Sequence, residues 1–526
     1  MECEKLTSRI KNPILPGFNP DPSIVKANGR YYIAVSSFQW LPGIRIYEST
    51  NLIEWKHKTD VLTTQHDFRG NPIDCSVWAP QISYYNNKFY VVYTDVKSTT
   101  RPFKDCRNYL ITSESIEGPW SEPVYLNGSG FDPSLFHDDN GKKYLLNVIW
   151  DYRLTTGNKS DGIILQEFDE KKNCLIGDVI KIFDGTELKK TEASHIYKKD
   201  GYYYLITAEG GTGKGHAVTV ARSKKITGPY ELDPDNPMLT SAHNPDWPFQ
   251  QSGHASLIET DNNEWYMAHL MTRPVDGEYV ILGRETAIQK VYWDEKGWLR
   301  LSHGGKLPAI EVKAPKGTHF EMKQQTTDFT DYFNQGVLDK EWNTLRTAAT
   351  EKWFSFRESE NGLRIYGGES VQSLFNHHLI GTRQKDFVFK ADTEVSFEPT
   401  NFLQMAGMLL YLNEKNYIYL YITHDEKKGK VLRLMKSIDG TFNLISSKYE
   451  LEENSAVKLG VKVDGIIAQF YYEENKEKKP VAELQDISFL SGGFTGNFIG
   501  LSCQDMNMYK GCHADFSYFK YKSLNN

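Results

Sequence analysis

With 526 residues, the chain is too long for one ordinary hydrophobic core, so its length predicts two domains. Its net charge of −7 and pI of about 6.1 argue against the basic surface that nucleic-acid binding needs, so we expect no nucleic-acid partner. The sequence contains no apolar run long enough for a signal peptide or a membrane span, which predicts a cytoplasmic protein with no membrane association.

The cysteines show no CxxC pair and no regular spacing, so we expect reduced thiols and no disulfide framework. Cys503 and Cys512 are the pair that a local bridge in an oxidising compartment would join. The six cysteines are Cys3, Cys75, Cys106, Cys174, Cys503 and Cys512.

Five related segments recur in the first part of the chain, 53 to 61 residues apart. Each has proline or a small residue in second place, an aliphatic residue in fourth place, a turn of Asn, Asp or Gly, and then an aromatic-rich strand. This order is typical of a β-hairpin. The segments are DPSIVKANGRYYIAV from Asp21, APQISYYNNKFYVVY from Ala79, DPSLFHDDNGKKYLLNV from Asp132, ASHIYKKDGYYYLIT from Ala193 and HASLIETDNNEWYMAH from His254.

Each hairpin is expected to begin a four-stranded antiparallel blade, which predicts a five-bladed β-propeller over residues 12–311. Helical periodicity is nearly missing. Because the innermost strands of a propeller surround a central axis, the first residue of every segment should lie near one shared cavity.

The rest of the chain predicts a second all-β domain. Residues 312–327 are polar and lack periodicity, which indicates a linker. From residue 328 to residue 526, segments such as FKADTEVSF, NYIYLYITH and ADFSYFKYK alternate or run apolar at strand length. This pattern predicts an antiparallel, jelly-roll-like β-sandwich.

Three acidic residues fall at or beside the inner ends of the blades: Asp21, Asp132 and Glu192. A single aspartate before proline is commonly only a turn residue. Three acids from separate blades that converge on one cavity instead favour catalysis, because neighbouring carboxyls separate their pKa values and let one act as an acid and another as a base. Hydrolysis of a glycosidic bond uses such a pair.

Six blocks in order, FNPDPSI, SVWAPQI, GFDPSLF, TEASHIY, SGHASLIE and LGRETAIQ, resemble glycoside hydrolase family 43, and closely its β-xylosidase branch with a C-terminal sandwich. The resemblance covers essentially the whole chain. It implies an exo-acting, inverting enzyme that releases terminal β-1,4-linked xylose from xylo-oligosaccharides. Asp21 would be the general base and Glu192 the general acid, with Asp132 raising the pKa of Glu192 and orienting it. Inversion places the two carboxyls roughly 6.5–9.5 Å apart.

Four further residues are expected to bind substrate. The resemblance implies that Arg284 contacts sugar hydroxyls, and an ion pair with Glu285 or a blade acid is the alternative. Phe38, Trp78 and Phe131 flank the acid-bearing segments and would offer flat apolar faces to a pyranose, although aromatic residues also fill blade interfaces.

Phe494, in SGGFTGNF, is the candidate for the phenylalanine that closes one side of the pocket in the resembling β-xylosidases, and a place in the sandwich core is the alternative. His254 belongs to the axis column, either as a channel filler or as a substrate-binding residue. In some family members the matching histidine lies at a central calcium or other divalent ion, but calcium prefers oxygen ligands. We therefore expect no required cofactor, with a divalent cation near His254 as the alternative.

Other activities are compatible with parts of this pattern. The enzyme would act mainly or additionally as an α-L-arabinofuranosidase if its pocket accepts arabinofuranosyl groups, so we expect xylo-oligosaccharides or arabinose-containing substrates as partners. Fructan-cleaving relatives begin with NDPNG, from which NPDPS departs. A non-catalytic carbohydrate-binding propeller would not need all three acids, and no WD or kelch signature indicates a peptide binder. Homo-oligomers are common in the family, so self-association is expected without a defined interface.

Overall fold

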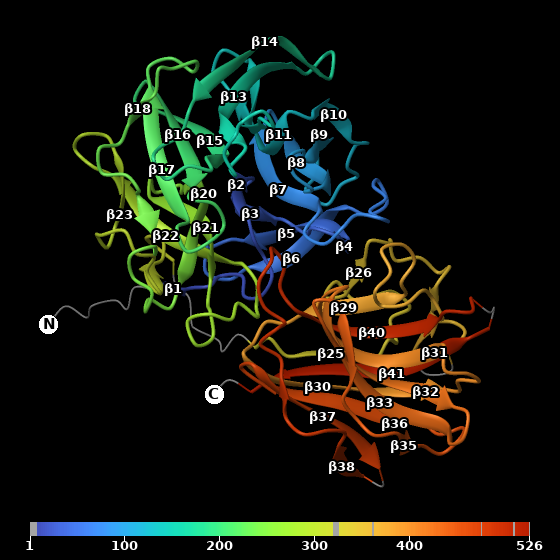
Figure 1. Cartoon of the computed structure of the whole chain (residues 1–526). Coiled ribbons are helices and arrows are strands. Elements are labelled where there is room, and N and C mark those ends of the chain that lie inside the picture. Colours follow the sequence, from blue (N-terminus) through green and yellow to red (C-terminus); the bar gives the residue numbers. More distant parts are fainter. Residues whose placement is uncertain (1–7, 319–325, 360–361, 475, 509–510, 525–526) are drawn as a thin grey trace, which may run out of the picture.

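The computed structural model describes residues 8–318, 326–359, 362–474, 476–508 and 511–524. In these ranges the regular secondary structure consists of β-strands, which form a propeller and a sandwich (Figure 1). This confirms the predicted all-β fold. No helix that could span a membrane is present in the same ranges. Cys3 and part of the predicted linker, residues 319–325, lie outside them, and the other five cysteines are free thiols.

Five antiparallel sheets form the blades of the propeller. The innermost strands β2, β7, β11, β15 and β20 contact one another in a closed ring, which confirms the five-bladed arrangement. The blades are, in chain order, β2 (Ser23–Ala27), β3 (Arg30–Val35), β5 (Gly43–Ser49) and β6 (Lys56–Leu62); β7 (Ser76–Tyr85), β8 (Lys88–Ser98), β9 (Asp105–Ser113) and β10 (Val124–Asn127); β11 (Gly130–His137), β12 (Lys143–Trp150), β13 (Ser160–Asp169) and β14 (Cys174–Phe183); β15 (Glu192–Lys199), β16 (Tyr202–Glu209), β17 (Ala217–Ser223), β18 (Glu231–Leu232) and β19 (Leu239–Thr240); and β20 (Gln250–Glu259), β21 (Trp265–Thr272), β22 (Glu285–Trp293) and β23 (Leu299–Leu301).

The first residue of every repeat has the same unusual backbone conformation. Asp21, Ala79, Asp132, Ala193 and His254 all have φ between 39° and 56°, a left-handed region that residues other than glycine seldom adopt. In the second to fifth blades, the pairing of the inner strand also shifts register at this point, as at a β-bulge. Bulges re-aim side chains. The repeated sequence pattern therefore marks the place where each blade turns side chains toward the axis.

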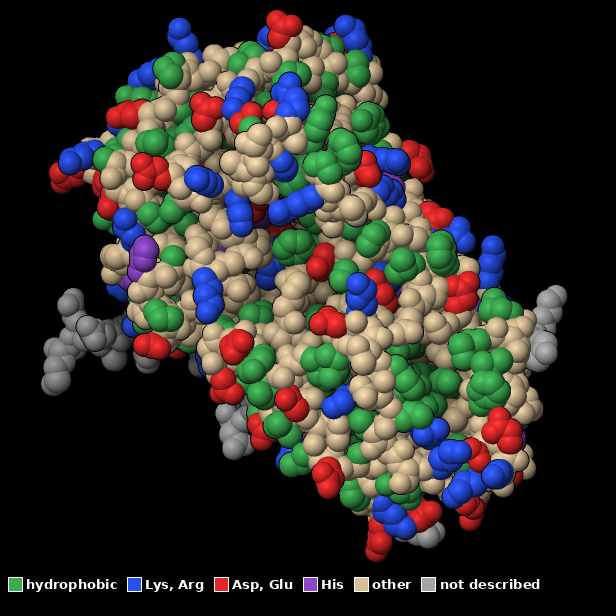
Figure 2. All heavy atoms as spheres, viewed as in Figure 1, with side chains coloured by type: hydrophobic (Ala, Val, Ile, Leu, Met, Phe, Trp, Pro, Cys, Tyr) green, Lys and Arg blue, Asp and Glu red, His purple; other side chains and the backbone are tan. Residues whose placement is uncertain are grey.

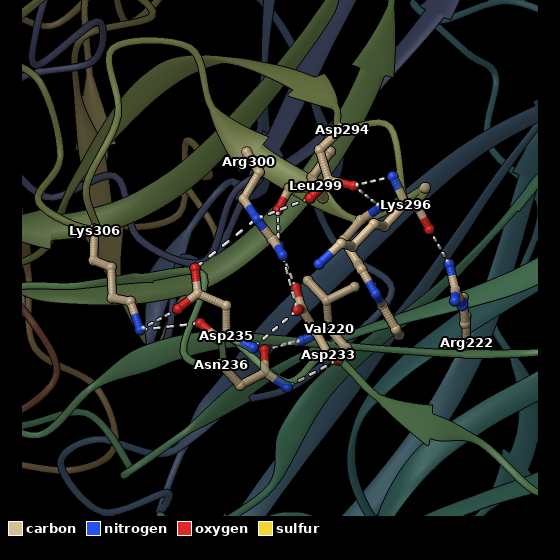
Figure 3. A network of polar contacts seen from close by, with 12 residues as sticks. Val220, Arg222, Asp233, Asp235, Asn236, Asp294, Lys296, Leu299, Arg300 and Lys306 are labelled. Atoms are coloured by element: carbon tan, nitrogen blue, oxygen red, sulfur yellow. Dashed lines mark hydrogen bonds and ion pairs between the residues drawn. The ribbon is translucent and has the colours of Figure 1, made fainter.

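Strand pairing joins the two ends of the propeller, and a charged network joins its fourth and fifth blades. Strand β1 (Arg9–Lys11) pairs with β24 (Glu311–Lys313), which brings the start of the propeller against its end. Figure 3 shows a polar network between the fourth and fifth blades, centred on Arg300 of β23. Its Nη2 donates to Asp233 Oδ1 over 3.0 Å, and its Nε lies 3.3 Å from Asp294 Oδ2. Asp233 belongs to the fourth blade, so its contact with Arg300 holds the outer edges of the two blades together, whereas Asp294 lies in the same blade as Arg300.

The sandwich consists of two nine-stranded antiparallel sheets whose facing surfaces enclose a large apolar core. One sheet contains β34 (Thr441–Leu444), β33 (Gly429–Ile438), β32 (Asn416–Asp425), β31 (Gln404–Asn413), β40 (Phe498–Asp505), β29 (Leu379–Arg383), β26 (Asn343–Leu345), β4 (Trp40–Leu41) and β35 (Tyr449–Glu450). The other contains β27 (Phe354–Ser355), β28 (Leu363–Tyr366), β41 (His513–Ser523), β30 (Val388–Phe397), β36 (Val457–Asp464), β37 (Ile467–Glu474), β38 (Glu477–Pro480), β25 (Phe329–Asp331) and β39 (Gln485–Asp486).

The propeller contributes a strand to one sandwich sheet. Strand β4, which follows the second strand of the first blade, pairs with β26 through Leu41 and Trp40. The Trp40 ring is fully buried and stacks on Phe498 with ring centroids 3.7 Å apart. Nearby, Arg383 Nε donates to the Phe18 carbonyl over 2.8 Å. The two domains thus share a packed, hydrogen-bonded interface that fixes the sandwich against the mouth of the propeller.

The face of the molecule seen in Figure 2 shows no single dominant charge. On the face seen in Figure 2, Lys and Arg side chains are interspersed with Asp and Glu side chains, and apolar side chains form small groups between them. This face therefore offers no continuous basic surface.

Candidate active site

A cavity of about 380 Å³ lies where the inner strands begin, at the small end of the roughly 300–1,000 Å³ range of ligand pockets. The structure brings all nine residues predicted from the sequence into its lining. They are Asp21, Phe38, Trp78, Phe131, Asp132, Glu192, His254, Arg284 and Phe494. Eight come from the propeller and one from the sandwich, so the pocket is shared by both domains.

Asp21 is a buried carboxylate surrounded by groups that favour its charged form. Arg284 Nη1 lies 2.7 Å from Asp21 Oδ1, Ser36 Oγ donates to Oδ2 over 2.6 Å, and His254 Nδ1 lies 3.5 Å from Oδ1. Burial alone would raise the pKa of Asp21, but Arg284, His254 and Ser36 outweigh it and hold the pKa below its usual range. Asp21 is therefore ionised at neutral pH, as a general base must be.

Arg284 links the base to the sandwich. Its Nε donates to the Phe494 carbonyl over 3.2 Å, while its guanidinium lies 5.4 Å from the Phe38 ring centroid and 5.3 Å from that of Phe494. The alternative pairing with Glu285 does not occur, because Glu285 Oε2 accepts from Arg273 Nε over 2.7 Å. Of the two alternatives named for an ion pair, the blade acid Asp21 is the partner.

Asp132 and Glu192 behave in the opposite way to Asp21. Burial raises the pKa of Asp132, and the nearby charges of Glu192 and Asp21 raise it further. Burial also raises the pKa of Glu192, to about 7, with Lys104 opposing the shift and Asp21 adding to it. The described residues show no hydrogen bond between these two carboxyls, so their coupling is Coulombic. The pocket thus holds carboxyls that retain a proton beside one that does not.

Aromatic rings form a continuous wall beside these acids. The Phe494 ring stacks on Phe38 with centroids 6.1 Å apart and meets Trp78 edge-on at 5.6 Å. Phe131 in turn meets Trp78 edge-on at 5.6 Å. Flat apolar faces of this kind suit the C–H faces of a sugar ring, and the carboxyls supply its hydrogen-bonding partners.

Sequence reasoning missed the other nine residues of the lining, which are Arg101, Lys104, Trp150, Gly157, Asn158, Ser160, Lys190, Gly211 and Thr212. Lys104 Nζ lies 4.1 Å from the Phe131 centroid, 4.2 Å from that of Trp150 and 4.8 Å from that of Trp78. Most of these residues lie between the second and third strands of a blade. Since the second strand returns to the end where the first began, the topology itself would have placed these loops at the pocket.

The surroundings of His254 offer few of the oxygen ligands that calcium prefers. Burial lowers the pKa of His254, and its neighbours include the imidazoles of His216 and His195 and the carboxylate of Asp21, already paired with Arg284. Calcium prefers several oxygen ligands. In the described part of the chain, no group of three or more His, Cys, Asp or Glu side chains is arranged to hold a metal.

Comparison with known proteins follows the same division into two domains. Residues 10–299 match the model for Glycosyl hydrolases family 43. The chain belongs to glycoside hydrolase family 43. Residues 330–522 match the Beta xylosidase C-terminal Concanavalin A-like domain, in agreement with the observed sandwich. The predicted family and the predicted enzyme class, a glycoside hydrolase, are confirmed.

Similar family 43 proteins resemble the chain over nearly its whole length. The Beta-xylosidase of Bacillus subtilis (strain 168) is 44% identical over 98% of this chain and 99% of its own. Xylosidase/arabinosidase 43B of Humicola insolens is 40% identical over 98% of both chains. The crystal structure of xylan beta-1,4-xylosidase from Bacillus Halodurans C-125 has a TM-score of 0.95 and 45% identity, covering 98% of this chain and 100% of that one.

Proposed function

We propose that this family 43 hydrolase is an exo-acting β-xylosidase that removes terminal β-1,4-linked xylose from short xylo-oligosaccharides with inversion at the anomeric carbon. The observation that carries the proposal is that one pocket holds two carboxyls with opposite pKa shifts. The pKa of Asp21 lies below the usual range of an aspartate, and the pKa of Glu192 lies above that of a glutamate. The similarity to proteins named β-xylosidase supports xylose as the sugar that is released.

In the proposed reaction, Glu192 donates its proton to the glycosidic oxygen while Asp21 removes a proton from a water molecule on the opposite face of the sugar. The bond from C1 to the leaving oxygen breaks as the bond from C1 to the water oxygen forms, so the product is α-xylose. Asp21 then carries a proton and Glu192 has lost one, and exchange with solvent restores both. Burial and the charge of Asp21 keep the pKa of Glu192 high, while the role of Asp132 in raising that pKa and orienting Glu192 stays a prediction.

The shape of the pocket supports exo action. The cavity is small, and Phe494 of the sandwich packs against Phe38 and Trp78 on one side of it. A ring wall that blocks one side leaves room for the end of a chain, whereas an internal residue needs an open groove on both sides. We therefore propose that the terminal xylose lies against this wall and that the rest of the oligosaccharide extends past Lys104 and Trp150.

A side activity on α-L-arabinofuranosides is the second candidate, because the 40% identical relative from Humicola insolens is named a xylosidase/arabinosidase. The proposed proton transfers use only carboxyls of the chain and need no metal ion. The alternative, a divalent cation near His254, stays a prediction. Rates before and after treatment with a chelator, and after calcium is added back, test that prediction.

The experiment that tests the function is a proton NMR time course on xylobiose, followed before mutarotation, with an aryl α-L-arabinofuranoside in parallel. Early α-xylose is expected, together with a slower arabinofuranosidase rate. Early β-xylose would contradict the role of Asp21 as base. If folded protein cleaves neither substrate, with or without calcium, the proposed activity is wrong.

A further inference from the structure

The loop of residues 491–497 carries Phe494 from the sandwich into the pocket, and the backbone of Phe494 is held on both sides. Its carbonyl accepts from Arg284 Nε over 3.2 Å. Its amide N–H donates to Oδ1 of Asp74, a half-buried propeller residue, over 3.0 Å. The ring of Phe494 is therefore aimed by two contacts to the propeller, only one of which involves a residue proposed to act on the sugar.

Asp74 also holds the indole of Trp78, a second ring of the aromatic wall. Its backbone carbonyl accepts the indole N–H of Trp78 over 2.8 Å, and its own φ is 59°. The rings of Trp78 and Phe494 meet edge-on at 5.6 Å. A single residue thus fixes one aromatic side chain through its backbone and the other through its carboxylate.

The fit between Asp74 and the loop is close. A Cβ at Gly493, where φ is 72°, would lie 3.2 and 3.3 Å from the two carboxylate oxygens of Asp74. At the other end of the loop, a Cβ at Gly283 would lie 2.7 Å from the Cα of Gly496. These glycines let the sandwich loop approach the propeller closely enough for the hydrogen bond to form.

Within the described ranges, the Asp74 carboxylate is contacted by the Phe494 amide and by no competing side chain. The described residues show no ion pair to Asp74 and no side-chain hydrogen bond to it other than the one from the Phe494 amide. Burial raises the pKa of Asp74, and the Phe494 N–H acts against this shift. A half-buried carboxyl whose hydrogen bond, among the described residues, comes from this one amide indicates that the contact itself has a use.

We propose that Asp74 is a positioning residue that sets the sugar-contacting wall of the pocket by holding the Phe494 loop of the sandwich against Trp78 of the propeller. This inference rests on the proposed function. Asp74 does not line the cavity. It acts on substrate binding through Phe494, so the ring stays where a terminal sugar can lie against it.

The test is a double-mutant cycle with Asp74→Ala, Phe494→Ala and both together, measured as kcat and KM on xylobiose. We expect Asp74→Ala to raise KM about tenfold with a smaller change in kcat, because a contact made equally in the ground and transition states is lost. Asp74→Asn, which keeps an acceptor oxygen, should restore most of the affinity. The double variant should be no worse than Phe494→Ala alone.

The matched control is Asp67→Ala, an exposed carboxylate in the same segment that pairs with Arg69. It should leave both constants unchanged. A merely structural Asp74 would lower the melting temperature without changing KM. Unchanged KM in Asp74→Ala, or independent effects of Asp74→Ala and Phe494→Ala, would overturn the proposal.

A second readout separates this inference from the proposed function. In protein labelled with fluorophenylalanine, the ¹⁹F resonance of Phe494 can be assigned by its loss in Phe494→Leu. Asp74→Ala should shift that resonance, and Asp67→Ala should not. If the wild-type protein fails to cleave xylobiose, the proposed function is wrong, but the ¹⁹F shift still tests the positioning of Phe494. A resonance that does not move in Asp74→Ala overturns the positioning itself.

Discussion

The hydroxyl of Ser36 is a fixed hydrogen-bond donor to the proposed base. Ser36 is fully buried, and its Oγ donates to Asp21 Oδ2 over 2.6 Å while accepting the N–H of Ala79 over 2.7 Å. Because the amide occupies the acceptor side of the hydroxyl, the hydroxyl proton is directed at the carboxylate. Ser36→Ala therefore removes one of the groups that favour the charged form of Asp21.

The size of the effect follows from the charge on Asp21. A hydrogen bond to a charged group contributes about 1.5–3 kcal/mol, and about 1.4 kcal/mol corresponds to one pKa unit. The pKa of Asp21 should therefore rise by about 1–2 units in Ser36→Ala. Arg284, 2.7 Å away, still keeps the carboxylate ionised at neutral pH. Since a base loses activity as pH falls through its pKa, the acidic limb of the pH profile should move to higher pH by about 1–2 units.

The assay is kcat/KM on an aryl β-xyloside across the acidic range, which reports the groups of the free enzyme. Ser37→Ala is the matched control, because Ser37 is equally buried but its Oγ accepts from the Ile44 amide at 3.3 Å and has no contact with Asp21. An acidic limb that stays in place in Ser36→Ala would refute the assignment of that limb to Asp21. So would an equal shift in Ser37→Ala.

Three further predictions concern the acid, its neighbouring cation and the domain interface. Glu192→Ala should lower kcat on xylobiose by about 10²–10⁴-fold, and much less on aryl xylosides whose leaving groups need little protonation; equal losses on both substrates would contradict its role as the acid. Activity should fall as pH rises through the Glu192 pKa of about 7, and Lys104→Met should move this alkaline limb to higher pH, since the ammonium lowers that pKa; a shift to lower pH would be the opposite of what the charge predicts. Trp40→Ala should lower the free energy of unfolding by about 3–5 kcal/mol, measured by denaturant titration; a loss below about 1 kcal/mol would show that the stack on Phe498 contributes little.

The part of the site that the sequence predicted is the part that repeats. Asp21 and Asp132 are first residues of their segments, and Glu192 directly precedes one, so aligning the chain with itself brings all three toward one axis. Lys104 lies in the loop between β8 and β9, and Trp150 is the last residue of β12, where the corresponding loop of the next blade begins; these loops differ in length and composition from blade to blade. No internal alignment identifies them, and only the return of the second strand to the pocket end explains their place.

Contacts between the domains were beyond prediction for a different reason. Strand β4 is two residues long and is followed by proline, so locally it has the pattern of a loop, and its partner β26 lies about 300 residues further along the chain. The Asp74 carboxylate and the Phe494 amide are separated by 420 positions. The hydrophobic periodicity of a sequence predicts which residues of one strand share a face. It does not predict which distant segments come into contact, so it indicates neither of these two contacts.

The backbone conformation of the first residue of each repeat is set by the fold, whereas the residue type at that position is related to the chemistry. All five first residues adopt the left-handed conformation, although they include two alanines and a histidine. The geometry therefore belongs to the propeller blade and not to a particular residue type. Glycine would adopt it with the least strain, but glycine carries no side chain to the axis. Aspartate at Asp21 and Asp132 tolerates the conformation better than most residues and also supplies a carboxyl. Glu192 lies one position earlier, outside the strained conformation, and its longer side chain still reaches the pocket. Since the two alanines share this conformation, the strain itself does not distinguish the acids; what distinguishes Asp21 and Asp132 is that each brings a carboxyl into the pocket.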